Sequence, residues 1–93
     1  MTEKAIETKL REEVKKSGGL ALKFSSSYYI GIPDRIILLP GGKIIFVELK
    51  APGKKPTPIQ EVAIRKLRGM DFWVEVVDSC QTLEQLITEI NQL

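Results

Sequence analysis

Two charged side chains interrupt an otherwise apolar run near the middle of the chain. The run reads Ile44-Ile45-Phe46-Val47-Glu48-Leu49-Lys50, so Glu48 and Lys50 are two residues apart. Because side chains alternate across a β-strand, this spacing puts both on one face. A carboxylate near a core needs a compensating partner, which a divalent cation and a neighbouring ammonium would supply. The alternative is an ion pair at a strand end, which is the commoner explanation of an isolated Glu-x-Lys.

Asp34 helps to distinguish a metal site from a simple ion pair, because it begins the strand that should pair with the Glu48 strand. Two runs rich in branched residues, 35–39 and 43–49, flank Pro40-Gly41-Gly42, which predicts a hairpin. With a three-residue loop and a left-handed glycine, Asp34 lies opposite Glu48, roughly 5 Å away, and two carboxylates so placed bind one metal ion. With a two-residue turn, Asp34 opposes Leu49 and faces away. The metal site therefore requires the three-residue loop or a bulge.

The residue types that are absent narrow the chemistry. The chain has no histidine, which excludes serine and cysteine triads with a histidine base, histidine-metal nucleases and ribonucleases with paired imidazoles. Cys80 is the only cysteine, so an intramolecular disulfide and a cysteine-based zinc site are excluded as well, and we expect this thiol to be inert. Any hydrolysis must rely on carboxylates, lysine and metal.

Charge and hydropathy suggest where the chain works. Residues 1–70 carry fourteen basic and seven acidic side chains, whereas residues 71–93 carry none and five, a split of +7 against −5. A basic body would present a positive face to phosphates, although a solvated basic surface explains the charge equally well. No apolar run approaches the roughly 18 residues that cross a bilayer. A single cysteine fits a reducing compartment, so a cytoplasmic protein is predicted. We expect it to be of phage or bacterial intracellular type.

Hydrophobic periodicity predicts three helices and four strands. Ile6, Leu10 and Val14 indicate a helix over 3–17, begun by Thr2 and ended by Gly18-Gly19. A helix over 58–68 follows the cap Thr57. Its expected buried stripe is Ile59, Val62, Ala63 and Leu67, and Gly69 is expected to end it. A last helix covers 82–92, and strands are expected at 20–24, 35–39, 43–49 and 72–77.

The order αβββαβα predicts an α/β fold, of the α+β type with a mixed sheet, in one domain spanning 1–93. The two hairpin runs are apolar on both faces, which predicts central strands covered on each side. A chain this short buries a single core and is only modestly stable alone, so we also expect a homodimer. Trp73, on the last strand, is expected in the core or at an interface.

In this order, the motifs resemble a known nuclease superfamily. Gly31-Ile32-Pro33-Asp34, a hairpin turn, Glu48-Leu49-Lys50 and Gln60 on the next helix look like the PD-(D/E)XK nucleases and, among them, the VRR-NUC family. The resemblance covers nearly the whole chain, from Glu7 to the fourth strand. It implies a restriction-endonuclease-like αβββαβ core plus a C-terminal helix.

The resemblance also implies a set of site residues. Asp34 and Glu48 would bind Mg²⁺ or Mn²⁺ together with the backbone carbonyl of Leu49, and Lys50 would orient or deprotonate the attacking water. Glu7 matches the family's helix-borne acidic residue and would reach the metal directly or through water, although a solvated glutamate explains it equally well. Gln60 matches the family's glutamine, but it also completes a capping box with Thr57.

A second group of residues is expected to contact nucleic acid. The polar-aromatic loop before the site offers hydroxyls for phosphates and rings for stacking, and basic side chains flank the site on both sides. For the loop, packing on the domain or on a dimer partner is an equal alternative; for the lysines, solvation is the commoner one. The residues are Ser26, Tyr28, Tyr29, Lys23, Arg35, Lys54 and Lys55.

The leading hypothesis is a Mg²⁺- or Mn²⁺-dependent endonuclease that hydrolyses DNA phosphodiester bonds. Branched DNA is the expected substrate, because similar small members of the superfamily include Holliday-junction resolvases that act as homodimers. One alternative is a nucleic-acid-binding or interaction module with a nuclease fold and little catalysis of its own. The other is an α/β domain of unrelated function whose motifs arose by chance, which would place Asp34 and Glu48 on opposite faces.

Overall fold

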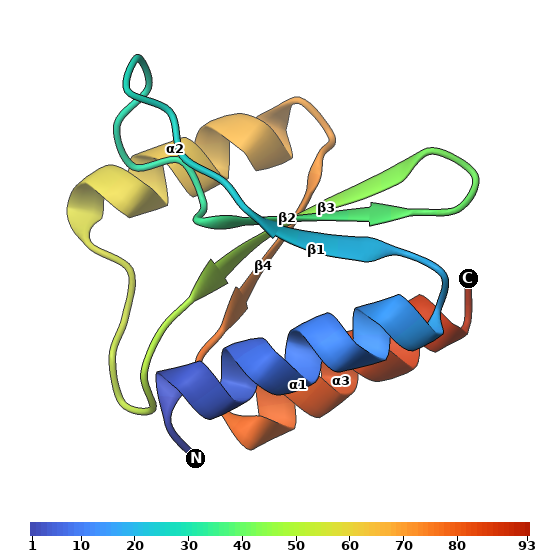
Figure 1. Ribbon diagram of the computed structural model, residues 1–93. Helices are drawn as coiled ribbons and strands as arrows, with labels where there is room; N and C mark the ends of the chain where they lie inside the picture. Colours follow the sequence, from blue (N-terminus) through green and yellow to red (C-terminus); the bar gives the residue numbers. More distant parts are fainter.

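The computed structural model describes residues 1–93 and contains the seven expected elements in the expected order (Figure 1). They are α1 (Glu3–Lys16), β1 (Leu20–Lys23), β2 (Arg35–Leu39), β3 (Lys43–Leu49), α2 (Pro58–Gly69), β4 (Trp73–Val77) and α3 (Cys80–Asn91). The α+β fold with a mixed sheet is therefore confirmed.

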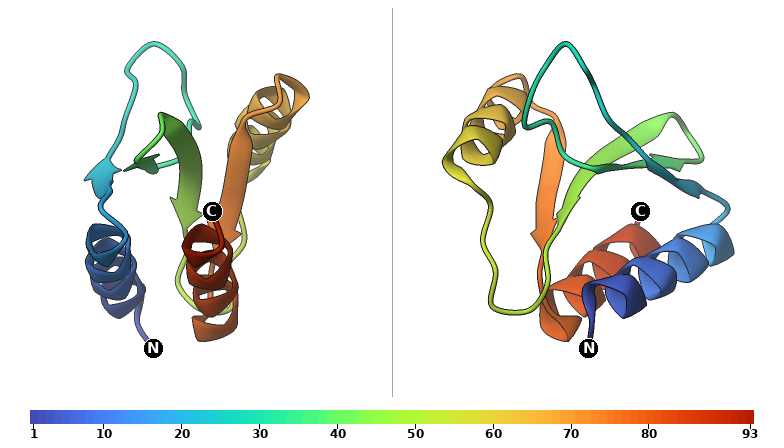
Figure 2. Two further views of the ribbon diagram at one scale, coloured as in Figure 1. Left: turned by 90° about the vertical axis from the view of Figure 1, so that its right-hand side faces the viewer. Right: turned by 60° about the vertical axis from the view of Figure 1, so that its left-hand side comes forward.

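The four strands form one mixed sheet in the order β1-β2-β3-β4. β1, β2 and β3 pair antiparallel, and β3 pairs parallel with β4. Helix α2 supplies the crossover between these parallel strands. Helices α1 and α3 lie side by side against one face of the sheet, and α2 lies on the other face (Figures 1 and 2).

The main core lies between the sheet and the α1–α3 pair. Thirteen buried residues form it, including Ile6, Leu10 and Val14 from α1 and Ile37 and Ile45 from the sheet. The three helix residues are those that the sequence predicted. Trp73 packs against this cluster, as expected for a core position. A smaller cluster under α2 has only three buried members, Ile64, Leu67 and Val74.

The helix ends follow local capping chemistry. The Thr2 side chain accepts a hydrogen bond from the Ala5 N–H, as predicted for the start of α1. The last helix begins at Cys80, two residues before the predicted start. The reason is that Ser79 is the cap and accepts from the Thr82 N–H, in a capping box that the prediction overlooked. No helix of the chain combines the length and apolarity needed to cross a bilayer.

Helix α2 buries a different set of residues from the predicted stripe. Ala63 and Leu67 are buried as expected, but Ile59 and Val62 are each 51% exposed and Ile64 is buried instead. Those two predictions were wrong because the helix packs on β4 and β3 through Ile64 and Leu67. Gly69 is the last residue of the helix, not its terminator.

The hairpin turn has the geometry that the metal site requires. Leu39 pairs with Lys43, so Pro40-Gly41-Gly42 is a three-residue loop. Gly41 and Gly42 have φ values of +83° and +75°, in the left-handed region that glycine tolerates. The ladder continues to Arg35 opposite Val47, which places Asp34 opposite Glu48.

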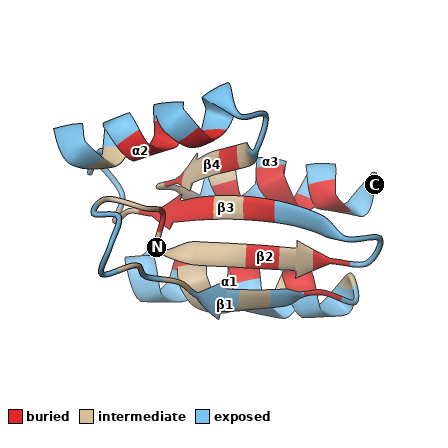
Figure 3. Ribbon diagram, turned by 90° about the horizontal axis from the view of Figure 1, so that it is seen from above, coloured by how far each residue is buried: buried red, intermediate tan, exposed pale blue.

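Only part of the second sheet face is covered. Helix α2 packs on β4 and reaches Phe46 of β3, while β1, β2 and the turn end of β3 are open above (Figure 3). Leu20, Leu22 and Ile44 are accordingly 59%, 43% and 39% exposed. The prediction that both hairpin strands are covered on each side was therefore wrong for this half. A single helix is too narrow to cover four strands.

We predict opposite responses for two isoleucines of α2. Ile64→Ala should lower the free energy of unfolding by about 2–4 kcal/mol, because it empties a buried position. Ile59→Ala should lower it by less than about 1 kcal/mol, since that side chain is half exposed. Urea unfolding followed by circular dichroism measures both. A larger loss for Ile59→Ala would contradict the observed helix orientation.

Candidate functional site

The face of the sheet opposite α1 and α3 carries three cross-strand rows of side chains. The first two rows are apolar: Leu20, Leu38 and Ile44, then Leu22, Ile36 and Phe46. In the third row, Asp34, directly before β2, and Glu48 of β3 are the next positions on the same face. The Asp34 Oδ1 accepts a hydrogen bond from the Leu49 N–H at 3.1 Å, which ties its carboxylate to the end of β3. The two carboxylates thus share one face, as the metal-site hypothesis requires.

The Glu48 carboxylate is the only charged group in the interior, and its residue is 3% exposed. Its Oε2 lies 3.7 Å from the Lys50 Nζ and accepts from the Gln60 Nε2 at 3.5 Å. Its Oε1 is buried without any hydrogen-bond partner. A buried carboxylate oxygen with no partner is energetically costly. A positive charge or a hydrogen-bond donor next to this oxygen would therefore stabilise the site.

Gln60 serves both roles that the sequence left open. Its Oε1 accepts from the Thr57 N–H at 2.9 Å, and the Thr57 hydroxyl accepts from the Gln60 N–H at 3.3 Å, which completes the capping box. Its Nε2 is left free to donate to Glu48. The start of α2 therefore holds one oxygen of the buried carboxylate.

Gly31 brings the Asp34 loop against that same helix start. Its φ is +90°, and a Cβ built there would lie 2.7 Å from the Ile59 carbonyl oxygen. Only glycine fits both the backbone conformation and the space. The Gly31-Ile32-Pro33-Asp34 segment is thus packed directly on the helix that carries Gln60.

Glu7 reaches the site through Arg35, not by joining the two carboxylates. Its carboxylate lies 3.4 Å from the Arg35 Nη2 and 3.3 Å from the Arg11 Nη1, while the Arg35 Nη1 lies 3.5 Å from the Asp34 Oδ2. No three acidic, thiol or imidazole side chains gather at any point of the chain. Arg35, which is also expected to hold phosphates, contacts two carboxylates here.

The surroundings change the protonation of Glu48. The pKa of its carboxyl is raised from 4.5 to about 7, chiefly by burial and then by the charge of Asp34, while the Lys50 ammonium partly opposes both effects. Desolvation and a like charge thus disfavour the ionised form in the metal-free protein.

The donor set fits a hard divalent cation. Mg²⁺ and Mn²⁺ prefer oxygen ligands, and the row offers the Asp34 carboxylate and the unpartnered Glu48 Oε1. A cation there would offset the charges that raise the Glu48 pKa. The orphaned oxygen is the observation that carries this fit.

The residues expected to contact nucleic acid lie on segments around the site. Tyr28 is 96% exposed and Tyr29 is 39% exposed, and the Ser26 Oγ accepts from both of their N–H groups, at 3.2 and 3.0 Å. Lys23 ends β1 opposite Arg35. The exposed side chains of Lys54 and Lys55 belong to the loop after Lys50.

Two features escaped the sequence reasoning. The link from Glu7 through Arg35 to Asp34 joins residues from a helix and a strand, and no local spacing signals it. Arg65 and Arg68 of α2 line a cavity with Lys55. Arg65 and Arg68 are three residues apart, and Glu61 lies four residues before Arg65. This spacing could have indicated a polar stripe on α2 beside its apolar stripe.

Comparison with known proteins finds nuclease relatives of this chain. No family model matches the chain. The chain is 48% identical over 89 residues to "Putative nuclease p44" of Acyrthosiphon pisum secondary endosymbiont phage 1, covering 96% of this chain and 95% of that protein. It is also similar to a solved structure described as a "VRR_NUC domain", with a TM-score of 0.85, 32% identity, and coverage of 95% of this chain and 97% of the other.

We predict that Glu48→Gln stabilises the metal-free protein at high pH and not at low pH. Because the pKa in the folded state, about 7, exceeds the ordinary 4.5, the wild type loses stability as the pH rises between these values. The neutral amide avoids this loss, which is on the order of 2–3 kcal/mol. Thermal unfolding in a chelator from pH 4 to pH 8 measures the difference. An equal effect at both ends of the range would contradict the buried-charge explanation.

Proposed function

This chain belongs to the VRR-NUC family of nucleases, and from that premise we propose that it is a divalent-cation-dependent endonuclease that hydrolyses DNA phosphodiester bonds. The observation that carries the proposal is the unpartnered, buried Oε1 of Glu48 beside Asp34 and Lys50. Without a histidine in the chain, hydrolysis must use these carboxylates and the lysine.

Asp34 and Glu48 would hold the ion, together with the backbone carbonyl of Leu49. When bound, Mg²⁺ or Mn²⁺ lowers the pKa of a bound water towards neutrality and polarises the phosphoryl oxygen. The protein prepares this site in advance, because the Leu49 N–H fixes Asp34 and the Gln60 amide fixes Glu48.

Lys50 supplies the remaining charge. Its side chain is 18% exposed, and its ammonium stands beside Glu48 on the same strand face. As an ammonium, it donates hydrogen bonds that orient the attacking water and stabilise the negative charge that develops on the phosphorus-bound oxygens. Glu7 acts as a positioning residue, because it shares the Arg35 guanidinium with Asp34.

We further propose that the substrate is branched DNA and that the enzyme is a homodimer. The support for a dimer is the open sheet face, whose first two rows are apolar and carry no charged side chain. A two-fold interface places the same patch on both subunits, so an uncharged apolar surface is complementary to itself. A standard interface needs about 800 Å² per partner, or about one seventh of the 5880 Å² surface here.

The dimer would also bring two catalytic sites close together. The carboxylate row directly follows the two apolar rows on the same strands. Two sites related by a two-fold axis suit a DNA junction that itself has two-fold symmetry. This geometry is the reason for preferring a branched substrate to a linear one.

Cleavage should depend on the three central residues. Asp34→Ala, Glu48→Ala and Lys50→Ala should each reduce Mg²⁺- or Mn²⁺-dependent cutting of supercoiled and four-way-junction DNA by at least about 100-fold. Calorimetry with Mn²⁺ should show a site that Asp34→Ala removes. Full cutting by all three variants would refute the proposal, and DNA binding without metal binding would favour a non-catalytic binding module.

Dimerisation should depend on the apolar rows. Leu22→Glu places a charge in the second apolar row of the open face and should shift sedimentation from dimer to monomer. Val62→Glu is the matched control, because Val62 is an exposed apolar residue of α2 outside these rows. A wild-type monomer at high concentration, or equal effects of both variants, would exclude this face as the dimer interface.

A further inference from the structure

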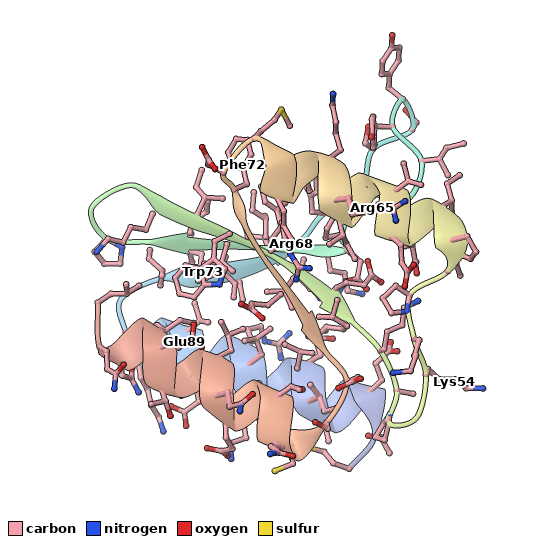
Figure 4. The ribbon with its side chains drawn as sticks, turned by 180° about the vertical axis from the view of Figure 1, so that it is seen from behind. Lys54, Arg65, Arg68, Phe72, Trp73 and Glu89 are labelled. Carbon is pink, nitrogen blue, oxygen red and sulfur yellow. The ribbon has the colours of Figure 1, made fainter.

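A cavity of about 380 Å³ lies where α2 passes over the open edge of β4, close to the first turn of α3. Glu61, Ile64, Arg65 and Arg68 of α2 line one side, and Val76, Asp78 and Thr82 line the other. Figure 4 shows Arg65 and Arg68 projecting from α2 on the β4 side of the molecule. We call this cavity the α2–β4 groove.

The α2–β4 groove adjoins the catalytic row but is separate from it. Val76, which lines the groove, pairs with Glu48 in the β3–β4 register, so the groove lies one strand away from the buried carboxylate. Gln60 turns towards Glu48, while the next residue, Glu61, lines the groove. Asp34, Glu48 and Lys50 line no part of it.

Three cationic side chains of the groove have no carboxylate partner. Lys55, Arg65 and Arg68 take part in none of the chain's ion pairs. The Arg68 Nε and Nη2 donate to the Val74 carbonyl oxygen at 3.3 and 2.8 Å, which fixes that guanidinium on the edge of β4. Lys55 and Arg65 are exposed and free to bind an anion.

The acidic residues of the groove restrict what that anion is. Glu61 and Asp78 lie in the same cavity, and the Asp78 Oδ1 accepts from the Thr82 hydroxyl at 3.3 Å. Two nearby carboxylates oppose a compact dianion such as free phosphate. A phosphodiester carries one charge per nucleotide and can follow the cationic side chains along the groove.

We propose that the α2–β4 groove binds the phosphodiester backbone of the nucleic acid beyond the scissile bond, an inference that rests on the proposed nuclease function. Lys55 stands five residues after Lys50 on the loop that leads from the catalytic strand to α2. A strand leaving the site past this loop meets Lys55, then Arg65, then Arg68.

The test is DNA binding in a chelator, so that no cleavage occurs. Lys55→Gln and Arg65→Gln should each weaken binding of a four-way junction by roughly three- to tenfold, and each should lower the slope of log affinity against log salt by about 1. Arg65→Glu should weaken binding further. Lys66→Gln is the matched control, because Lys66 is an exposed neighbour on α2 that does not line the groove.

Equal losses for Arg65→Gln and Lys66→Gln would overturn the proposal, because they would indicate net charge alone. No loss for either groove variant would overturn it as well. Cleavage in Mg²⁺, measured separately, tells this failure from failure of the proposed function. A protein that binds DNA through the groove but cuts none retains the groove and refutes the nuclease proposal. If the wild type cuts DNA and the groove variants bind DNA as tightly as the wild type, the groove proposal is refuted and the nuclease proposal is retained.

Discussion

The negative charge of Glu48, carried into the interior at the end of a central strand, is the constraint on which the site depends. Lys50 and Gln60 both approach one oxygen of its carboxylate, while the other has no partner. Asp34 adds a second negative charge on the same face, and burial together with that charge raises the pKa of the Glu48 carboxyl to about 7. Such an arrangement is unfavourable in the metal-free protein, and a bound cation would offset it. The fold thus tolerates local instability at the place where chemistry is proposed.

Several elements keep this charge in place. The three-residue turn sets the register that brings Asp34 across from Glu48, and the Leu49 N–H holds the Asp34 carboxylate. The capping box of α2 orients the Gln60 amide, and Gly31 lets the Asp34 loop pack on the same helix. The Arg35 guanidinium joins Asp34 to α1 through Glu7. The site is therefore held by the sheet and by helices α1 and α2, and not by a loop alone.

The placement of α2 divides the second sheet face into regions with different chemistry. Over β4 and part of β3 the helix buries a small apolar cluster, and its outer side forms the basic α2–β4 groove. Over β1 and β2 the sheet stays open and apolar. The carboxylate row lies between these regions. A helix that covered the whole face would have left neither an apolar surface for a second copy nor a groove beside the site.

Local signals in the sequence were sufficient for much of the fold. Alternation and helical periodicity predicted the seven elements, Thr57 and Gln60 predicted a capped helix, and the placement of Asp34, Glu48 and Lys50 predicted a shared face if the turn had three residues. Those signals act over a few residues, where backbone geometry dictates which side chains are neighbours. The sequence could not choose between the two turn registers, the rotation of α2 or the partner of Arg35. These depend on contacts such as Glu7 with Arg35, 28 residues apart, and only the packed tertiary structure decides them.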